Sequence, residues 1–166
     1  MIRIYICDEK KLLKNNGGYK EAIKKAVNST TRYLEKNRYI EGLEDVKEVE
    51  ISVNVTDNEG ILGLNREYRG QDKPTDVLSF PAHENIRGGG RLPVDMDGVC
   101  RLGDIVISLE KCEAQSVENG VTAEREIVYL TVHSVLHLFG YDHEVDGEEA
   151  EAMFGVQDEI MGSILG

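Results

Sequence analysis

Three histidines at short, regular spacing are the residues in this sequence best suited to metal chemistry. His133 and His137 are four residues apart, so on a helix they lie on one face, one turn apart. Gly140 can take the left-handed conformation that ends a helix, and the chain can then bring His143 back toward the pair. Three converging imidazoles predict a site for a divalent transition metal, with zinc expected and nickel or another transition metal as the alternative.

The predicted site has too few protein ligands to be a purely structural one. Structural zinc is normally held by four protein ligands, usually including cysteine, and residues 131–143 contain no cysteine. Three imidazoles leave one coordination position for a water, whose pKa the metal lowers to about 7. The pattern therefore predicts a hydrolase. The alternative, unrelated core histidines, is disfavoured because buried imidazoles without partners are costly.

The histidine spacing matches that of a known class of metalloenzymes, but the general base of that class is missing. Metzincin proteases share this histidine spacing and require a glutamate after the first histidine as the general base. The sequence has Ser134 there, which cannot accept a proton at neutral pH. A metzincin-like metallopeptidase is therefore the less favoured alternative.

The histidine stretch resembles the signature of the YbeY family of bacterial rRNA maturation factors, which are single-strand-specific endoribonucleases with a metal-bound histidine triad. The signature positions that match are His133, Leu136, His137, Leu138, Gly140, Tyr141, Asp142 and His143. Ser134 departs from the glycine usual in the family. Residues 64–81 and 102–108 resemble two further family segments in the same order, so the resemblance spans roughly residues 50–145.

The resemblance implies a metal-dependent endoribonuclease that acts on single-stranded rRNA precursors, in processing of the 16S rRNA 3′ end and in ribosome quality control. It implies the ribosome or its assembly proteins as partners and Arg69 as a catalytic residue. Arg69 is predicted in the last turn of a helix ended by Gly70, where position alone indicates an ordinary surface arginine. A non-catalytic ribosome-assembly factor with a structural metal is the alternative.

Composition predicts one domain, residues 1–166, without a membrane-spanning segment. The alternating start of the chain is too short for the apolar core of a signal peptide. Cys7, Cys100 and Cys112 are widely spaced and odd in number, which indicates reduced thiols and a cytoplasmic protein.

The net charge of −12 is unusual for a protein that binds nucleic acid. Residues 111–166 carry 2 basic and 12 acidic side chains, which gives −10 for this segment. We interpret this acidic segment as a solvated face. Binding of RNA would then depend on a local basic patch and the metal, or on a partner that delivers the RNA.

The hydrophobic pattern predicts an α+β fold in which a small mixed sheet of about four strands is covered by helices. Strands are expected near residues 2–6, 49–55, 76–80 and 101–108, and helices near 19–36, 57–69, 109–119, 123–138 and 146–164. Residues 56–59 read as a capping box, and a long loop with Gly88–Gly90 is expected at residues 82–100. The metal cleft is expected beside the histidine helix.

Four other polar residues receive individual predictions. Asp104 lies mid-strand among apolar residues, so we expect it to be buried and paired with a ligating histidine. Asp142 is a second candidate for such support, and with Asp104 and Glu144 it is a candidate general base. His83, in the long loop, is expected to be exposed and uninvolved.

Overall fold

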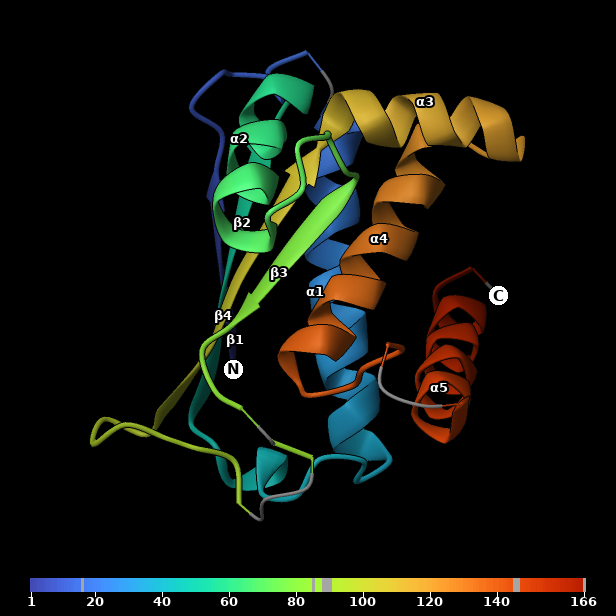
Figure 1. Ribbon diagram of the computed structural model, residues 1–166. Helices are drawn as coiled ribbons and strands as arrows, with labels where there is room; N and C mark the ends of the chain where they lie inside the picture. Colours follow the sequence, from blue (N-terminus) through green and yellow to red (C-terminus); the bar gives the residue numbers. More distant parts are fainter. Residues whose placement is uncertain (16, 85, 88–90, 145–146, 166) are drawn as a thin grey trace.

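The computed structural model describes residues 1–15, 17–84, 86–87, 91–144 and 147–165 (Figure 1). Within these residues, four strands and five α-helices follow one another in the order predicted. They are β1 (Ile2–Cys7), α1 (Gly17–Lys36), β2 (Glu48–Thr56), α2 (Asn58–Arg69), β3 (Val77–Pro81), β4 (Val99–Ser108), α3 (Leu109–Asn119), α4 (Ala123–Leu138) and α5 (Gly147–Leu165), with a short 3₁₀ turn at Leu43–Asp45.

The four described strands form one mixed sheet in the order β1-β2-β4-β3. β1 pairs with β2 and β2 pairs with β4 in parallel, whereas β3 is antiparallel to β4. The parallel β1–β2 pair needs a crossover, which α1 provides. β3 is therefore an edge strand, and the predicted small mixed sheet is confirmed.

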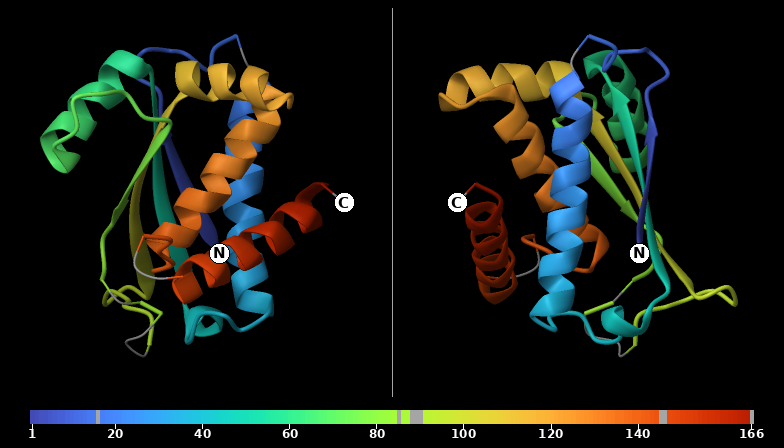
Figure 2. Two further views of the ribbon diagram at one scale, coloured as in Figure 1. Left: turned by 45° about the vertical axis from the view of Figure 1, so that its right-hand side comes forward. Right: turned by 180° about the vertical axis from the view of Figure 1, so that it is seen from behind.

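Helices cover the two faces of the sheet unequally (Figures 1 and 2). α1 and α4 pack on one face with α5 outside them, and α2 lies on the other face near one end. β2 alternates buried and half-buried residues along its whole length, which is the pattern of a strand with one fully covered face. The larger hydrophobic core lies between the sheet and α1 and α4.

α4 is the helix that positions the histidines, and it is the most buried helix of the fold. Most of its apolar side chains are buried, and those of Ile127, Val132, Val135 and Leu136 are fully so. Burial on nearly all sides fixes the rotation of the helix, because any turn about its axis would expose apolar side chains. The polar side chains on this helix therefore point in defined directions.

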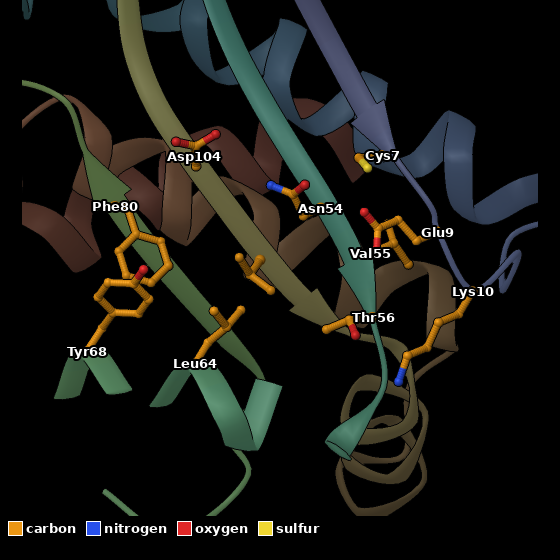
Figure 3. Close-up of a pocket in the computed structure, with 11 residues that line it drawn as sticks. Cys7, Glu9, Lys10, Asn54, Val55, Thr56, Leu64, Tyr68, Phe80 and Asp104 are labelled. Atoms are coloured by element: carbon orange, nitrogen blue, oxygen red, sulfur yellow. The ribbon is translucent and has the colours of Figure 1, made fainter. Parts of the chain in front are cut away.

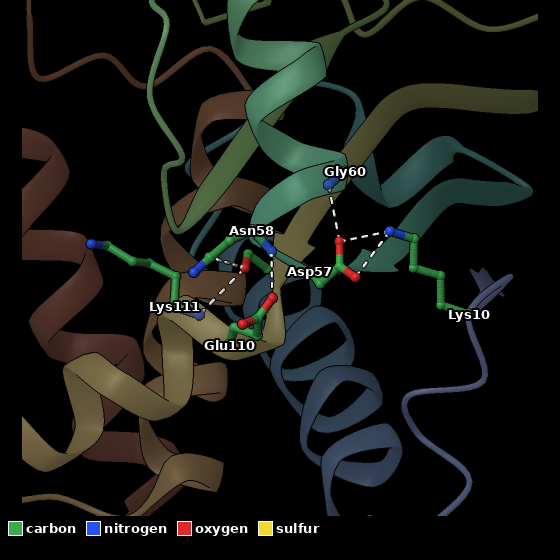
Figure 4. A network of polar contacts seen from close by, with 7 residues as sticks. Lys10, Asp57, Asn58, Gly60, Glu110 and Lys111 are labelled. Carbon is green, nitrogen blue, oxygen red and sulfur yellow. Dashed lines mark hydrogen bonds and ion pairs between the residues drawn. The ribbon is translucent and has the colours of Figure 1, made fainter.

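Helix caps tie the ends of α2 and α3 to each other and to the N-terminal loop (Figure 4). Asp57 accepts a hydrogen bond from the Gly60 backbone N–H at 2.9 Å and from Lys10 Nζ at 2.7 Å. The Ser108 hydroxyl donates to Asn58 Oδ1 at 2.8 Å. The capping box predicted from Thr56 is wrong by one residue, because Asp57 provides the N-cap.

Several predicted features fall at the limits of the described chain. Gly88–Gly90 and the first residue of the predicted last helix, Asp146, lie outside the described residues.

The helices within the described ranges lack the combination of length and hydropathy needed to cross a bilayer.

Candidate metal centre

His133, His137 and His143 converge on one point, as their spacing predicts. His133 and His137 lie one turn apart on α4, with their Nε2 atoms 3.1 Å apart. One nitrogen from each of the three rings lies within 4.8 Å of the others, and in the part of the chain described this is the cluster that could hold a metal ion. The arrangement suits a three-histidine site for a transition metal.

Gly140 makes the turn that returns His143 to the helix. Its φ of +98° belongs to the left-handed region, which residues with a side chain rarely adopt. A Cβ at this position would lie 3.3 Å from the Arg87 backbone nitrogen, so the space is filled as well. Both the backbone conformation and the nearby Arg87 backbone therefore favour glycine at position 140.

Hydrogen bonds fix the orientation of two of the rings. His137 Nδ1 lies 2.9 Å from the Tyr141 carbonyl oxygen, which can only accept, so Nδ1 carries the proton. His133 Nδ1 lies 3.0 Å from Gln157 Oε1 on α5. In both rings the Nε2 lone pair is then directed at the shared point, which is the tautomer that metal ligation requires.

Burial favours the neutral, ligating form of His133 and His137. Burial, followed by the neighbouring His133 and His143, lowers the pKa of His137 to about 4. Burial also lowers the pKa of His133, against an opposing effect of its hydrogen bond to Gln157. The Nδ1 of His143 is buried without a hydrogen-bond partner in the described structure. A nitrogen in that situation is costly unless it has another partner, so the residues present fit a bound cation.

The histidines open into a cavity of about 910 Å³ between α4 and the β3 edge. Arg69, at the end of α2, lines the same cavity, with its guanidinium 2.8 Å from the Ser79 carbonyl oxygen, to which it donates. The guanidinium also lies 5.7 Å from the centre of the Phe80 ring. The structure therefore places Arg69 and the histidines around one space, although they are far apart in sequence.

The two aspartates predicted to support the histidines are placed differently. Asp142 lines the cavity, but its Oδ1 accepts a hydrogen bond from the Glu144 backbone N–H at 2.8 Å and so stabilises the turn. Asp104 is exposed and lines a different cavity, on the other face of the sheet. The prediction that Asp104 is buried against a histidine is wrong, because strand alternation directs its side chain away from α4.

Other residues near the histidines differ from expectation. His83 is half-buried and lines the histidine cavity, so the prediction that it is exposed is wrong. Gln157 and Phe154 lie along the apolar stripe of α5 and were not predicted near the site, yet Gln157 contacts His133 and the Phe154 ring lies 6.3 Å from the His133 ring. A glutamine within that apolar stripe was the sequence signal for a buried polar partner.

Comparison with known proteins agrees with this geometry. Residues 4–165 match the family described as Endoribonuclease YbeY. Proteins of that name are 50% identical over 124 residues in a Thermoanaerobacter species, covering 73% of this chain and 77% of the relative. The relative from Persephonella marina is 41% identical over 145 residues, covering 87% and 83%.

A solved structure is also similar. The solution structure of TM1509 from Thermotoga maritima matches with a TM-score of 0.55 and 28% identity, covering 99% of this chain and 89% of that one. The sequence match extends over nearly the whole chain and includes the segments that carry the histidines and Arg69. The chain therefore belongs to the YbeY endoribonuclease family.

Proposed function

We propose that this protein is a metal-dependent, single-strand-specific endoribonuclease that matures rRNA precursors, at the 3′ end of 16S rRNA, and takes part in ribosome quality control. The observation that carries the metal dependence is the convergence of His133, His137 and His143 in a cavity shared with Arg69. Family membership supports cleavage of RNA, and the donor set supports zinc, with nickel as the alternative.

The three histidines would hold the ion through one nitrogen each. When bound, a divalent metal supplies a Lewis acid and an activated water for attack on the scissile phosphate. The Tyr141 carbonyl and Gln157 hold two of the rings in the tautomer that leaves Nε2 free. The chain's own contribution at this point is therefore a fixed set of neutral ligands.

Arg69 would bind the scissile phosphate and stabilise the charge that develops in the transition state. Its contact with the Ser79 carbonyl holds the guanidinium at the cavity rim, and the Phe80 ring supports it from the side. A planar guanidinium always carries its charge, which suits a role as a fixed electrostatic partner for phosphate.

The carboxylates at the cavity give two candidates for moving a proton. Asp142 and Glu144 both line the cavity, and Glu144 Oε1 lies 3.9 Å from His143 Nε2. Asp104, the third candidate suggested by sequence, lies in the other cavity and is not retained for this role.

A non-catalytic assembly factor is the second candidate function, favoured by the net charge of −12. In that case the metal would stabilise the fold and the protein would bind ribosomal partners without turnover. A metallopeptidase receives no such support, since the side chain of Ser134 is fully buried and cannot act on a water in the cavity. Either ribosomal role would require the protein to act in the cytoplasm.

Cleavage of a single-stranded rRNA precursor by metal-loaded and metal-stripped protein tests the proposal. Cutting that returns only with added zinc is the expected result. Arg69→Ala should keep its metal and lose about 10²- to 10³-fold in cleavage rate. A folded, metal-bound protein that cuts no RNA in the presence or absence of ribosomal particles would instead favour the assembly factor.

A further inference from the structure

The face of the sheet opposite α4 carries a second cavity, of about 490 Å³ (Figure 3). Its walls come from the sheet, from α2 and from the loop after β1. Its volume lies within the range of small-molecule sites. None of the side chains that line it also lines the histidine cavity, although the Phe80 ring contacts Arg69.

Paired strands arrange the cavity's side chains in rows across the sheet. Phe80 on β3 is directly opposite Asp104 on β4, and Asp104 is opposite Ser52 on β2. Beyond the cavity lining, the row continues through Ser52 to Tyr5 on β1, which is 46% exposed. Directly paired side chains lie about 5 Å apart on one face, so a carboxylate stands beside an aromatic ring with a second ring at the far end of the row.

The aromatic wall of this cavity is accessible. The rings of Tyr68 and Phe80 meet edge to face, with centroids 5.3 Å apart, and Tyr68 is 59% exposed. Proteins bind unpaired bases of single-stranded RNA by stacking them on such rings and by hydrogen bonds to their edges. The polar groups needed for the second interaction lie next to the rings.

Asp104 and Asn54 face the cavity without protein partners. Neither side chain has a hydrogen bond or ion pair within the described residues, and Figure 3 shows both on the same face of the sheet as Phe80. The one lysine in the lining, Lys10, is held by both carboxylate oxygens of Asp57. The cavity thus offers hydrogen-bond acceptors and aromatic surface, which suit a base better than a phosphate.

This cavity is adjacent to the histidine cavity. Arg69 and Ser79 line the histidine cavity, while their chain neighbours Tyr68 and Phe80 line the second one. β3 and the C-terminal half of α2 contribute residues to both cavities. A single strand of RNA whose phosphate is bound by Arg69 can therefore continue past β3 and place a neighbouring base on the open face of the sheet.

We propose that the cavity formed by Asp104, Tyr68 and Phe80 binds one unpaired base of the RNA substrate and prefers guanine. The inference rests on the proposed endoribonuclease function. A carboxylate has two acceptor oxygens side by side, and guanine is the RNA base whose Watson–Crick edge presents adjacent N1–H and N2–H donors. Adenine, cytosine and uracil place an acceptor beside their donor on that edge.

Binding of two labelled pentamers, UUGUU and UUUUU, to metal-free protein tests the inference by fluorescence anisotropy at one salt concentration. UUGUU should bind about tenfold more tightly. Asp104→Asn should remove that preference by weakening UUGUU alone, and Tyr68→Ala should weaken both pentamers. Thermal unfolding of each variant checks that the fold is intact.

A simple charge effect predicts the opposite result for Asp104→Asn, so the measurement distinguishes base recognition from charge. Removing a negative charge without base recognition would strengthen binding of both pentamers. Glu118→Gln, on the exposed surface of α3, makes the same charge change and should leave the preference unaltered.

Equal affinity for the two pentamers, an unchanged preference in Asp104→Asn, or no binding of either pentamer would overturn the inference. Because metal-free protein is used, these results are independent of cleavage. A guanine preference in a protein that cuts no RNA would leave the base site standing and refute the proposed function.

Discussion

At the scale of single residues, Gln157 provides the hydrogen bond that links α5 to the histidine centre. Its side chain is 1% exposed, and its Oε1 lies 3.0 Å from His133 Nδ1. Hydrogen-bond partners of ligating histidines set ring orientation, and their loss typically weakens metal binding by about 10- to 100-fold. We therefore expect Gln157→Leu to raise the Kd for zinc by that factor in a chelator-competition assay.

Two matched variants separate this effect from general damage. Gln157→Glu keeps an acceptor for the imidazole N–H and should retain zinc affinity. Gln115→Leu, on α3, makes the same chemical change away from the histidines and should bind zinc as the unaltered protein does. Equal zinc affinity in Gln157→Leu and Gln115→Leu would show that Gln157 has only a packing role.

The three cysteines should differ sharply in reactivity. Burial raises the pKa of Cys100 to about 11 and also raises the pKa of Cys112, whereas Cys7 is exposed. The thiolate is the reactive form, and a raised pKa leaves the buried thiols protonated at pH 8. Ellman's reagent should detect one thiol in the native protein and three after denaturation, and Cys7→Ser should abolish the native signal.

At the scale of elements, the turn after α4 decides whether the third histidine reaches the other two. Gly140→Ala introduces a side chain at φ +98° and against the Arg87 backbone. Strain of this kind costs about 1–3 kcal/mol. Urea unfolding should report that loss of stability, and zinc affinity should fall with it because His143 shifts.

A control for this substitution lies on α2. Gly63 is helical, exposed, and has open space where a Cβ would be added. Gly63→Ala should therefore stabilise the protein by roughly 0.5–1 kcal/mol. If Gly140→Ala behaved like Gly63→Ala, the turn would not be under the constraint described.

The N-cap of α2 should be another point of sensitivity. Asp57→Ala removes the acceptor for the Gly60 N–H and the partner of Lys10, and should cost about 1–2 kcal/mol (Figure 4). Asp57→Asn keeps the cap and loses only the ion pair, so it should cost much less in the same unfolding assay. Equal losses in the two variants would assign the effect to Lys10 instead.

This site also has a defined pH dependence. The hydrogen bond from Lys10, followed by that from Gly60, lowers the pKa of Asp57. A carboxyl whose pKa is lower in the folded state stabilises the protein above its unfolded pKa, about 3.9, and loses this contribution as the pH falls through the folded value. The free energy of unfolding should therefore fall less steeply at acid pH in Asp57→Asn than in the unaltered protein, as measured by urea unfolding over a pH series.

The sequence predicted these elements well and some side-chain directions poorly. Helical spacing identified His133 and His137, because two residues four apart must share a face of a helix. The same reasoning placed Asp104 on a strand but could not say which face of the sheet its side chain occupies, since the residues on both faces nearby are apolar. A glutamine in the apolar stripe of α5 indicates a buried polar partner, but that this partner is His133 follows from packing of α5 on α4, which no local pattern encodes.

At the scale of the whole molecule, the charge distribution limits how RNA can be held. The chain carries −12 overall, and Arg69 and Lys73 are the basic side chains that line the histidine cavity in the described structure. Each phosphate contact contributes about −0.7 to the slope of log K against log salt for single strands. We expect a slope of roughly −1 to −2 between 50 and 300 mM salt.

A slope steeper than about −4 would contradict this prediction, since it would require more phosphate contacts than these two side chains make. Arg69→Ala should make the slope less steep by about 0.7, the contribution of one phosphate contact. Arg125→Ala, on the outer surface of α4, should leave the slope unchanged. The same titration measured with ribosomal particles would show whether a partner supplies the missing positive charge.

The three candidate ligands all lie within residues 133–143, and this has a consequence for how metal and folding are coupled. An unfolded chain keeps the same three imidazoles on one short segment, so it retains some affinity for the ion. A ligand that binds both states stabilises the native state by less than its native Kd alone implies. Metal binding to this segment therefore does not require the strands of the sheet, all of which precede residue 109, to have paired.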